Sequence, residues 1–417
     1  MVDASGADTK ACGKESSPCS SLKQALNRLK PPEDEPPTGD GQLYKPELTV
    51  DVVSEVNLSE SVRMVSTKAD GVSVGRGGIM FAEGAGVGAE WIRCEVAAEF
   101  SMLKLSFEAG ADFGEKTFIA FEGSRLKSCL VLRSCEVIGH PSAADSTMFM
   151  GSALVQIVSG VLIVEGCTFN SLRTKSVLLD CAGANSVSFK TSSFRSMAVG
   201  LPVLRGGAGG ASVILSGCNF RNESAVHSEG SSSSVPVIAE IDGSGSVRLL
   251  SVSCSDCSVE ADDGTLVTFE SSNFAMESCD FNGKITSASI SSSYSTLSSS
   301  LLSSSIPSLS PFTIKSNANP WFLPEQVCAR NGSMVKVKSS GGAIKNTTFS
   351  NSTYGALSVH ERNIELQEMK FVSNWPREFG MRTTARRNVL FRSSSIRLAS
   401  QLNGRQEAQS RQMGRGG

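Results

Sequence analysis

A short phrase recurs along the middle of the chain and constrains its fold more than any other feature. Each copy has an apolar run, two spacer residues, a small residue, one more spacer and usually a Phe. The clear copies are LIVEGCTF, SFKTSSF, ILSGCNF, FAMESCDF, AIKNTTF and ELQEMKF, which end at Phe169, Phe194, Phe220, Phe281, Phe349 and Phe371. Looser copies end at Val137 and Cys254, so the successive spacings are 32, 25, 26, 34, 27, 68 and 22 residues. An irregular period of this size predicts a solenoid with inserted loops.

The apolar residues within each copy predict strands. They alternate or run together, are rich in Val, Ile, Leu and Phe, and lie between clusters of Gly, Ser and Asn. The chain has little amphipathic helical pattern and no leucine-rich-repeat consensus. We therefore expect an all-β protein, a right-handed parallel β-helix, whose body covers residues 42–375.

The small residue two positions before the Phe is typical of a stacked interior column. It is Cys135, Cys167, Ser192, Cys218, Cys279 and Thr347 in turn, with Val252 and Met369 as exceptions. Equivalent positions in adjacent coils lie about 4.8 Å apart, but their parallel Cβ directions disfavour a disulfide. We interpret these thiols as small buried hydrophobic groups.

Residues 1–41 form an N-terminal cap and connector in this interpretation. Ser20 or Ser21 can cap a short helix, and one helix face carries four apolar residues: Leu22, Ala25, Leu26 and Leu29. A solenoid needs such a lid, because its first coil otherwise exposes an open edge. A disulfide between Cys12 and Cys19 would pin the lid in an oxidising compartment. The segment PPEDEPPTGDG then follows as a Pro-rich acidic connector.

The phrase CGKESSPCSSLKQAL, with the body, resembles right-handed parallel β-helix proteins of the pectin-lyase-like superfamily. The resemblance is to large surface proteins of protists and to polymorphic outer-membrane proteins, which carry repeated GGA(I/L/V) and FxxN tetrapeptides. This chain has GGAI ending at Ile344 and FVSN starting at Phe371, with FSN at Phe349 and FRN at Phe220 as near matches. It has no C-terminal segment like an outer-membrane barrel. The resemblance implies a surface or secreted binding rod, by analogy of fold.

No catalytic, cofactor-binding or metal-binding residues are assigned from the sequence. Lyases and glycosidases on this fold need paired carboxylates or a calcium and arginine cluster, and the only adjacent acids in the middle coils, Asp262 and Asp263, lie in a polar turn. Cys254 and Cys257 form a lone CxxC without a second pair or nearby histidines, so a β-arc or a surface disulfide is favoured over zinc.

Signals for cellular location conflict. Five N-x-S/T sequons, at Asn57, Asn222, Asn331, Asn346 and Asn351, are candidate N-glycosylation sites. The start MVDASGADTK lacks the basic and apolar regions of a signal peptide, which leaves a cytosolic chain, or a start without an exon or signal, as expectations. Apolar runs are too short for a transmembrane helix.

Two segments break the repeat. In residues 287–310, 14 of 24 positions are Ser, which predicts a disordered loop between coils. Residues 376–417 carry nine Arg against two Glu and are expected to form a basic disordered tail. With a net charge of −2 and only Phe379 and Phe391 as aromatic residues in this tail, we expect no nucleic-acid partner.

The pattern as a whole favours a non-enzymatic, adhesin-like surface or secreted protein that binds glycans or proteins at a cell surface. One alternative is a carbohydrate-active lyase or glycosidase on the same fold. A second is an intracellular scaffold, favoured by the missing signal peptide and by thiols that need no oxidation.

Overall fold

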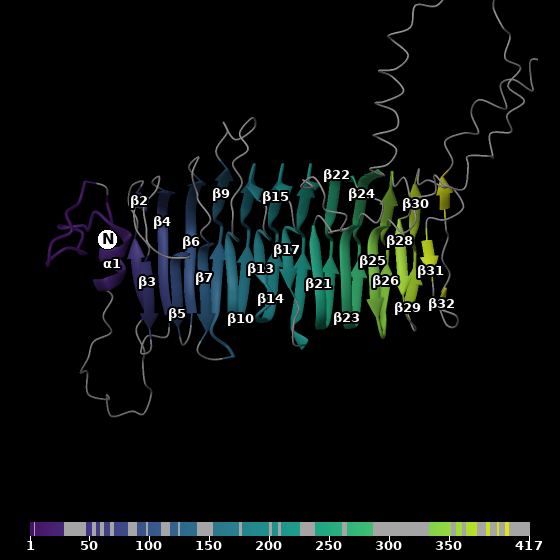
Figure 1. The fold of residues 1–417 in the computed structure, drawn as a ribbon, viewed down its shortest axis with the longest axis horizontal. Coiled ribbons are helices and arrows are strands. Elements are labelled where there is room, and N and C mark those ends of the chain that lie inside the picture. The colour runs from purple at the N-terminus through teal and green to yellow at the C-terminus, as the bar shows by residue number, and fades with distance from the viewer. Residues whose placement is uncertain are drawn as a thin grey trace, which may run out of the picture.

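Each copy of the repeated phrase forms two strands separated by a corner. In the copy that ends at Phe169, the apolar run lies in β10 (Val155–Glu165) and the Phe lies in β11 (Thr168–Asn170). The computed structural model describes residues 1–3, 5–28, 47–51, 56–58, 62–66, 71–81, 90–96, 99–109, 117–123, 126–139, 153–174, 177–199, 202–206, 210–225, 238–260, 265–286, 333–351, 356–360, 364–372, 381–383, 390–391 and 397–399. Its strands pair in parallel and stack into an elongated solenoid (Figure 1), which confirms the all-β parallel fold.

The paired strands form three walls around one interior. The first wall contains β3 (Val62–Ser66), β5 (Glu90–Val96), β7 (Thr117–Gly123), β13 (Leu179–Cys181), β17 (Leu204–Gly206), β25 (Ser333–Ser339), β28 (Leu357–His360), β31 (Met381–Thr383) and the first parts of β10, β21 (Ala239–Leu250) and β23 (Thr265–Glu277). The second wall contains β1 (Glu47–Asp51), β8 (Cys129–Arg133), β14 (Ala184–Lys190), β18 (Ser212–Ser216), β26 (Gly342–Lys345), β29 (Ile364–Gln367), β32 (Leu390–Phe391), the last parts of β10, β21 and β23, and the first parts of β4 (Gly71–Phe81) and β6 (Glu99–Ala109).

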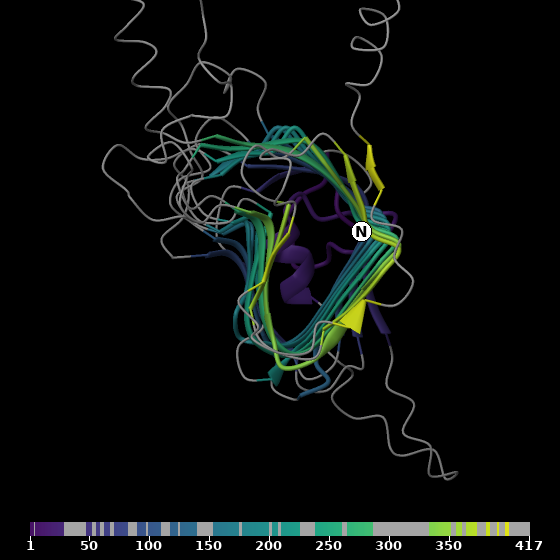
Figure 2. The same cartoon turned by 90° about the vertical axis from the view of Figure 1, so that its right-hand side faces the viewer.

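The third wall contains β2 (Val56–Leu58), β9 (Glu136–Gly139), β11, β15 (Ser193–Arg195), β19 (Asn219–Arg221), β27 (Thr348–Ser350), β30 (Lys370–Val372), β33 (Arg397–Ala399), the last parts of β4 and β6, and the first parts of β22 (Ser253–Glu260) and β24 (Asp280–Thr286). Short strands follow it at β12 (Arg173–Thr174), β16 (Ala198–Val199) and β20 (Ser224–Ala225). Viewed along the axis in Figure 2, successive coils superpose into these walls.

Register between coils stacks like residues in the core. The Phe residues of the repeated phrase pair with one another in the third wall, so Phe169, Phe194 and Phe220 lie in one column. Neighbouring rings are stacked, with centroids 4.8 Å apart for Phe169 and Phe194. Cys254 takes the place of Phe in the column between Phe220 and Phe281. The looser copy of the phrase that ends at Cys254 is therefore in register with the other copies, as predicted.

A left-handed corner precedes the position of the small residue in eight successive described coils. The corner residues Ser134, Gly166, Thr191, Gly217, Ser251, Ser278, Asn346 and Glu368 all have φ between 44° and 62°. Such a conformation costs an ordinary L-residue about 1–2 kcal/mol and is easy for Gly and Asn. The corner turns the chain from the second wall into the third.

The predicted column of small residues is buried, and its side chains also hydrogen-bond. Most members donate to the carbonyl oxygen two residues earlier, as Cys167 Sγ does to Glu165 at 3.5 Å and Ser192 Oγ to Lys190 at 3.0 Å. Thr347 Oγ1 does the same to Lys345 at 2.9 Å. Cys, Ser and Thr therefore exchange at this position because each is small and each donates to a carbonyl at the corner. The interpretation of these side chains as small buried hydrophobic groups is therefore incomplete, because they also donate hydrogen bonds.

The N-terminal lid has the predicted construction. Helix α1 (Leu22–Arg28) begins after Ser21, whose Oγ accepts a hydrogen bond from the Gln24 amide at 3.2 Å. Leu22 and Ala25 are buried, whereas the side chain of Leu26 and all of Leu29 lie outside the described residues. The helix lies at the N-terminal end of the rod and projects onto its interior (Figures 1 and 2).

Several expectations fall partly or wholly on residues without a described placement. The Pro-rich connector, the Ser-rich loop at 287–310, and Asp262 with Asp263 all lie outside the described residues. Strands β31, β32 and β33 pair with the preceding coil, so parallel stacking continues past residue 375, where the tail was expected to begin. Among the described residues, no helix is long and apolar enough to cross a bilayer.

Candidate functional site

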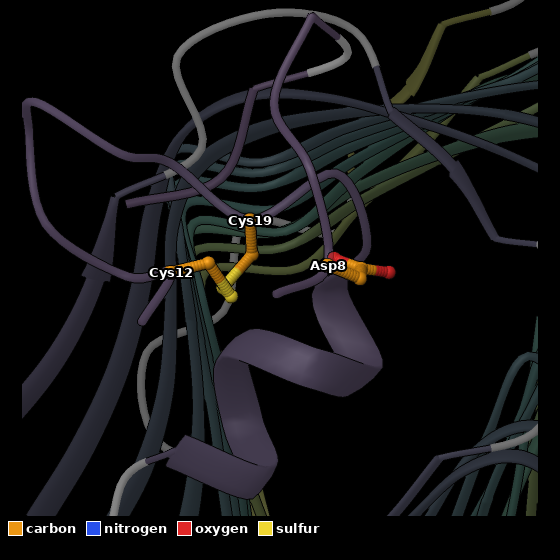
Figure 3. Close-up of side chains that lie close together, drawn as sticks. All are labelled: Asp8, Cys12 and Cys19. Carbon is orange, nitrogen blue, oxygen red and sulfur yellow. A yellow bond between two sulfur atoms is a disulfide. The ribbon is translucent and has the colours of Figure 1, made fainter. Parts of the chain in front are cut away.

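The first candidate is a cluster in the lid, shown in Figure 3, where Asp8 approaches Cys12 and Cys19. Their potential ligand atoms lie within 4.8 Å of one another. The two sulfur atoms form the predicted disulfide, with a Cα–Cα distance of 4.9 Å. Disulfide sulfur is not the thiolate that metals bind. With the disulfide formed, the cluster of Asp8, Cys12 and Cys19 has a structural role and is not a metal centre.

Asp8 joins the disulfide loop to the start of α1. Its Oδ1 accepts hydrogen bonds from the amides of Ser20 at 2.8 Å and Ser21 at 3.0 Å. Burial raises the pKa of the Asp8 carboxyl, but the hydrogen bonds from Ser21 and Ser20 outweigh it and hold the pKa below its usual value. The carboxylate therefore fixes the helix entry while the disulfide closes the loop before it.

The second candidate is a polar cluster inside the rod, which was not among the expectations from the sequence. Glu223 is 0% exposed and occupies an interior column between Met197 and Cys257. Its Oε2 accepts a hydrogen bond from the Met197 amide at 3.2 Å, while Oε1 has no partner among the described residues. Burial, with a smaller contribution from Cys257, raises the Glu223 pKa to about 9. The side chain is therefore a neutral acid near pH 7.

A sequence signal for Glu223 does exist. It stands three residues after Phe220, the same offset that separates Leu172 from Phe169 and Met197 from Phe194. Both of those residues are buried. Glu223 also lies inside the sequon that begins at Asn222, a context typical of an exposed turn.

Cys254 and Cys257 lie next to this carboxyl group. Both are buried and neither is disulfide-bonded. A register shift between them, with exposed Asp256 at φ 57°, turns both side chains inward. The structure therefore favours the β-arc over the surface disulfide. Burial, followed by a hydrogen bond with Cys257, raises the Cys254 pKa well above its usual value, which makes the thiol a poor nucleophile.

Three of the five sequon asparagines have described, exposed positions, and all three stand at left-handed corners: Asn222, Asn346 and Asn351. Each Nδ2 donates to the preceding coil, for example from Asn351 to Asn282 Oδ1 at 2.9 Å. Asn57 lies in β2 without a described side chain, and Asn331 lies outside the described residues. The exposed corner positions have room for a glycan, but Asn is also favoured there by its backbone conformation.

The outer side of the third wall is polar from β11 to β27. One column of outward residues contains Thr168, Ser193, Asn219, Ser253, Asp280 and Thr348, and the next contains Asn170, Arg195, Arg221, Ser255, Asn282 and Ser350. This second column continues into Ile138 before and Val372 after. The polar groups donate and accept hydrogen bonds along the length of the rod. Such a surface can recognise an extended polar ligand, and among its described outward residues it carries no aromatic side chain.

The chain matches no protein-family model, no curated protein and no solved structure.

Proposed function

We propose that the protein is a non-enzymatic binding or structural rod of the cell surface or secretory route, with glycans or proteins as its partners. The disulfide between Cys12 and Cys19 carries this proposal. Stable structural disulfides are typical of oxidising compartments. Here the bond holds the lid that covers the first coil. The polar outer side of the third wall supplies a surface for ligands.

We also infer a relationship to the pectin-lyase-like superfamily, and the positions of its short motifs support it. In GGAI, Gly342 begins β26 and Ile344 points into the core. In the near matches FRN and FSN, the Phe lies in the interior column and the Asn occupies a left-handed corner. The motifs thus coincide with places where a coil needs an inward aromatic ring and a residue that tolerates positive φ.

An intracellular scaffold is the second candidate, favoured by the nine free cysteines among the described residues. All but Cys129 are buried. Burial raises the pKa of Cys279 to about 11 and also raises the pKa of Cys94 and Cys181. Such thiols resist oxidation in either compartment, so they do not argue against the secretory route.

The two candidates differ in the state of the lid in the native protein. We would purify the protein from its own cells, unfold it without reductant, label free thiols and measure the intact mass, with and without an N-glycan-removing enzyme. The secretory proposal predicts ten labelled thiols, which is twelve cysteines minus the two in the disulfide, and a glycan-dependent mass shift. Twelve labelled thiols and no mass shift would support the scaffold and reject the surface rod.

A further inference from the structure

Two exposed arginines occupy neighbouring positions on the outer side of the third wall. Arg195 in β15 pairs in parallel register with Arg221 in β19. In both strands the central Phe points inward, so the arginine after it points outward. Neighbouring strands lie about 4.8 Å apart. The two guanidinium groups therefore project from adjacent coils on the same side of the rod.

This match of cation with cation, which recurs on the same wall where Lys370 pairs in register with Arg397, differs from the four described ion pairs of the rod. Four ion pairs each join a cation to a carboxylate on the adjacent coil: Arg93 with Glu122, Arg133 with Glu165, Arg205 with Glu240, and Lys338 with Glu270. Arg195 and Arg221 have no ion pair with a described carboxylate. Arg195 Nε instead donates to Ser193 Oγ at 3.0 Å. Because like charges on neighbouring strands repel, the position attracts an anion.

Within the strands of this wall the acidic side chains lie two coils from the arginine pair, while the exposed Asp256 stands at the corner after Ser255, the residue that pairs with Arg221. In the column beside the arginine pair, Glu136 is two coils before Ser193 and Asp280 is two coils after Asn219. Two coil spacings amount to about 10 Å, close to the Debye length at physiological salt. The intervening outward residues are Thr168, Asn170, Ser253 and Ser255. Within the strands of the wall the arginines are thus flanked by hydroxyl and amide groups, with Asp256 as an exposed acidic group at the adjoining corner.

We propose that Arg195 and Arg221 form a binding site for the sulfate groups of an extended polysaccharide that lies along the third wall. A sulfate ester has three terminal oxygens and can accept hydrogen bonds from two guanidinium groups together, whereas a planar carboxylate is matched by one. The neighbouring hydroxyl and amide side chains suit the hydroxyl groups of sugars. A nucleic acid fits less well, because the described outward residues offer no aromatic ring for base stacking.

This site rests on the proposed binding function and deepens it by naming the ligand class. Asn222, a candidate glycosylation site, directly follows Arg221 and is exposed. A glycan attached there would stand beside the arginine pair. The protein for the binding test is therefore treated with an endoglycosidase that leaves a single sugar on the Asn, because an amidase would convert a glycosylated Asn222 to Asp beside the arginines.

The test measures the affinity of the purified full chain for heparin, used as a sulfated polysaccharide, over a range of salt concentrations. Arg195→Ala and Arg221→Ala are each expected to weaken binding about tenfold, as expected for loss of a hydrogen bond to a charged group. Arg248→Ala is the matched control, because it removes the same charge from an exposed position on the second wall. The control should change the affinity less than about twofold, the effect of a distant exposed charge.

The Arg221→Glu variant distinguishes a loss of heparin binding from a loss of folding. The introduced carboxylate would face Arg195 and reproduce the pairing seen at the four ion pairs, so the thermal unfolding temperature should not fall. Heparin binding should be lost. Loss of heparin binding together with an unchanged unfolding temperature supports a ligand site.

Several outcomes would overturn the site. They are no heparin binding by the unaltered chain at low salt, equal losses for Arg248→Ala and the two arginine variants, or unchanged binding by the double alanine variant. Equal affinity for desulfated heparin or for single-stranded DNA would reject the assignment to sulfated polysaccharide. None of these results depends on the thiol count or the glycan mass, so failure here is distinguishable from failure of the surface-rod proposal.

Discussion

The Phe194 ring lies parallel to the Phe220 ring, with centroids 4.7 Å apart and 6° between the ring planes. Phe194 also stacks on Phe169 from the preceding coil, so its ring has an aromatic neighbour on both sides. Each coil of a solenoid contacts only its neighbours, and its stability is a sum of such local contacts. The aromatic column is therefore a major source of cohesion in the middle of this rod.

Replacing the central ring should destabilise the rod strongly. Phe194→Ala is expected to lower the free energy of unfolding by about 4 kcal/mol, because it leaves a buried cavity and removes two stacked contacts. Urea unfolding followed by circular dichroism measures the loss. Leu126→Ala is the control, since Leu126 is 77% exposed and should change stability by less than about 0.5 kcal/mol. A loss below about 1 kcal/mol for Phe194→Ala would contradict the role of the column.

The buried carboxyl group of Glu223 should make stability fall as pH rises. Burial, with Cys257 second, raises the folded-state pKa from 4.5 to about 9. The folded protein therefore holds a proton that the unfolded chain releases. The contribution is fully present below pH 4.5 and is lost progressively up to about pH 9. The slope is about −1.4 kcal/mol per pH unit, which amounts to about 3 kcal/mol between pH 4.5 and 7.

Glu223→Gln should remove this slope and raise stability at pH 7 and above, because the amide keeps an oxygen for the Met197 amide and cannot ionise. Urea unfolding at pH 5, 7 and 8.5 measures the effect. Glu277→Gln serves as the matched control at an exposed position and should keep the slope of the unaltered chain. Parallel pH profiles for the unaltered chain and Glu223→Gln would show that Glu223 is not a buried neutral acid.

The left-handed corner predicts a stabilising substitution. Thr191 has φ 46°, a conformation that is unfavourable for a β-branched residue. The same corner carries Asn346 in a later coil, and Asn tolerates this conformation. Thr191→Asn should therefore raise the free energy of unfolding by about 1 kcal/mol. The opposite change, Gly217→Val at φ 62°, places a β-branched residue at the same corner. It should lower the free energy of unfolding by about 1–2 kcal/mol, measured by thermal or urea unfolding.

If both corner variants change stability in the same direction, backbone strain is not the controlling factor at this position.

The disulfide should hold the lid against the first coil. Replacing both Cys12 and Cys19 by Ser opens a loop with a sequence separation of 7 residues, at a cost of about 2–3 kcal/mol. The effect should be local, so amide hydrogen exchange should rise in α1 and not in β14 or β18. Reductant should produce the same change in the unaltered chain and none in the double variant. Unchanged exchange in α1 would mean that Asp8 and helix packing suffice.

Local sequence determined the repeating parts of this protein. The apolar runs, the small residue and the Phe recur at fixed offsets, and each has a local reason: strand propensity, space at the corner, and a ring in the core. The lid could be predicted in the same way, from Ser21 as helix cap and from the short spacing of Cys12 and Cys19. These features depend on residues that are close together in the chain.

Only the tertiary structure decided which residues face one another across coils. Arg195 and Arg221 are 26 positions apart in the chain. They lie side by side because β15 and β19 pair in parallel with these two residues opposite each other. Glu223 is a polar residue in a sequence typical of a turn, yet stacking with Met197 and Cys257 places its side chain in the core. The physical reason is that parallel pairing fixes the inward or outward direction of a whole strand, and that register belongs to the assembled solenoid rather than to any one coil.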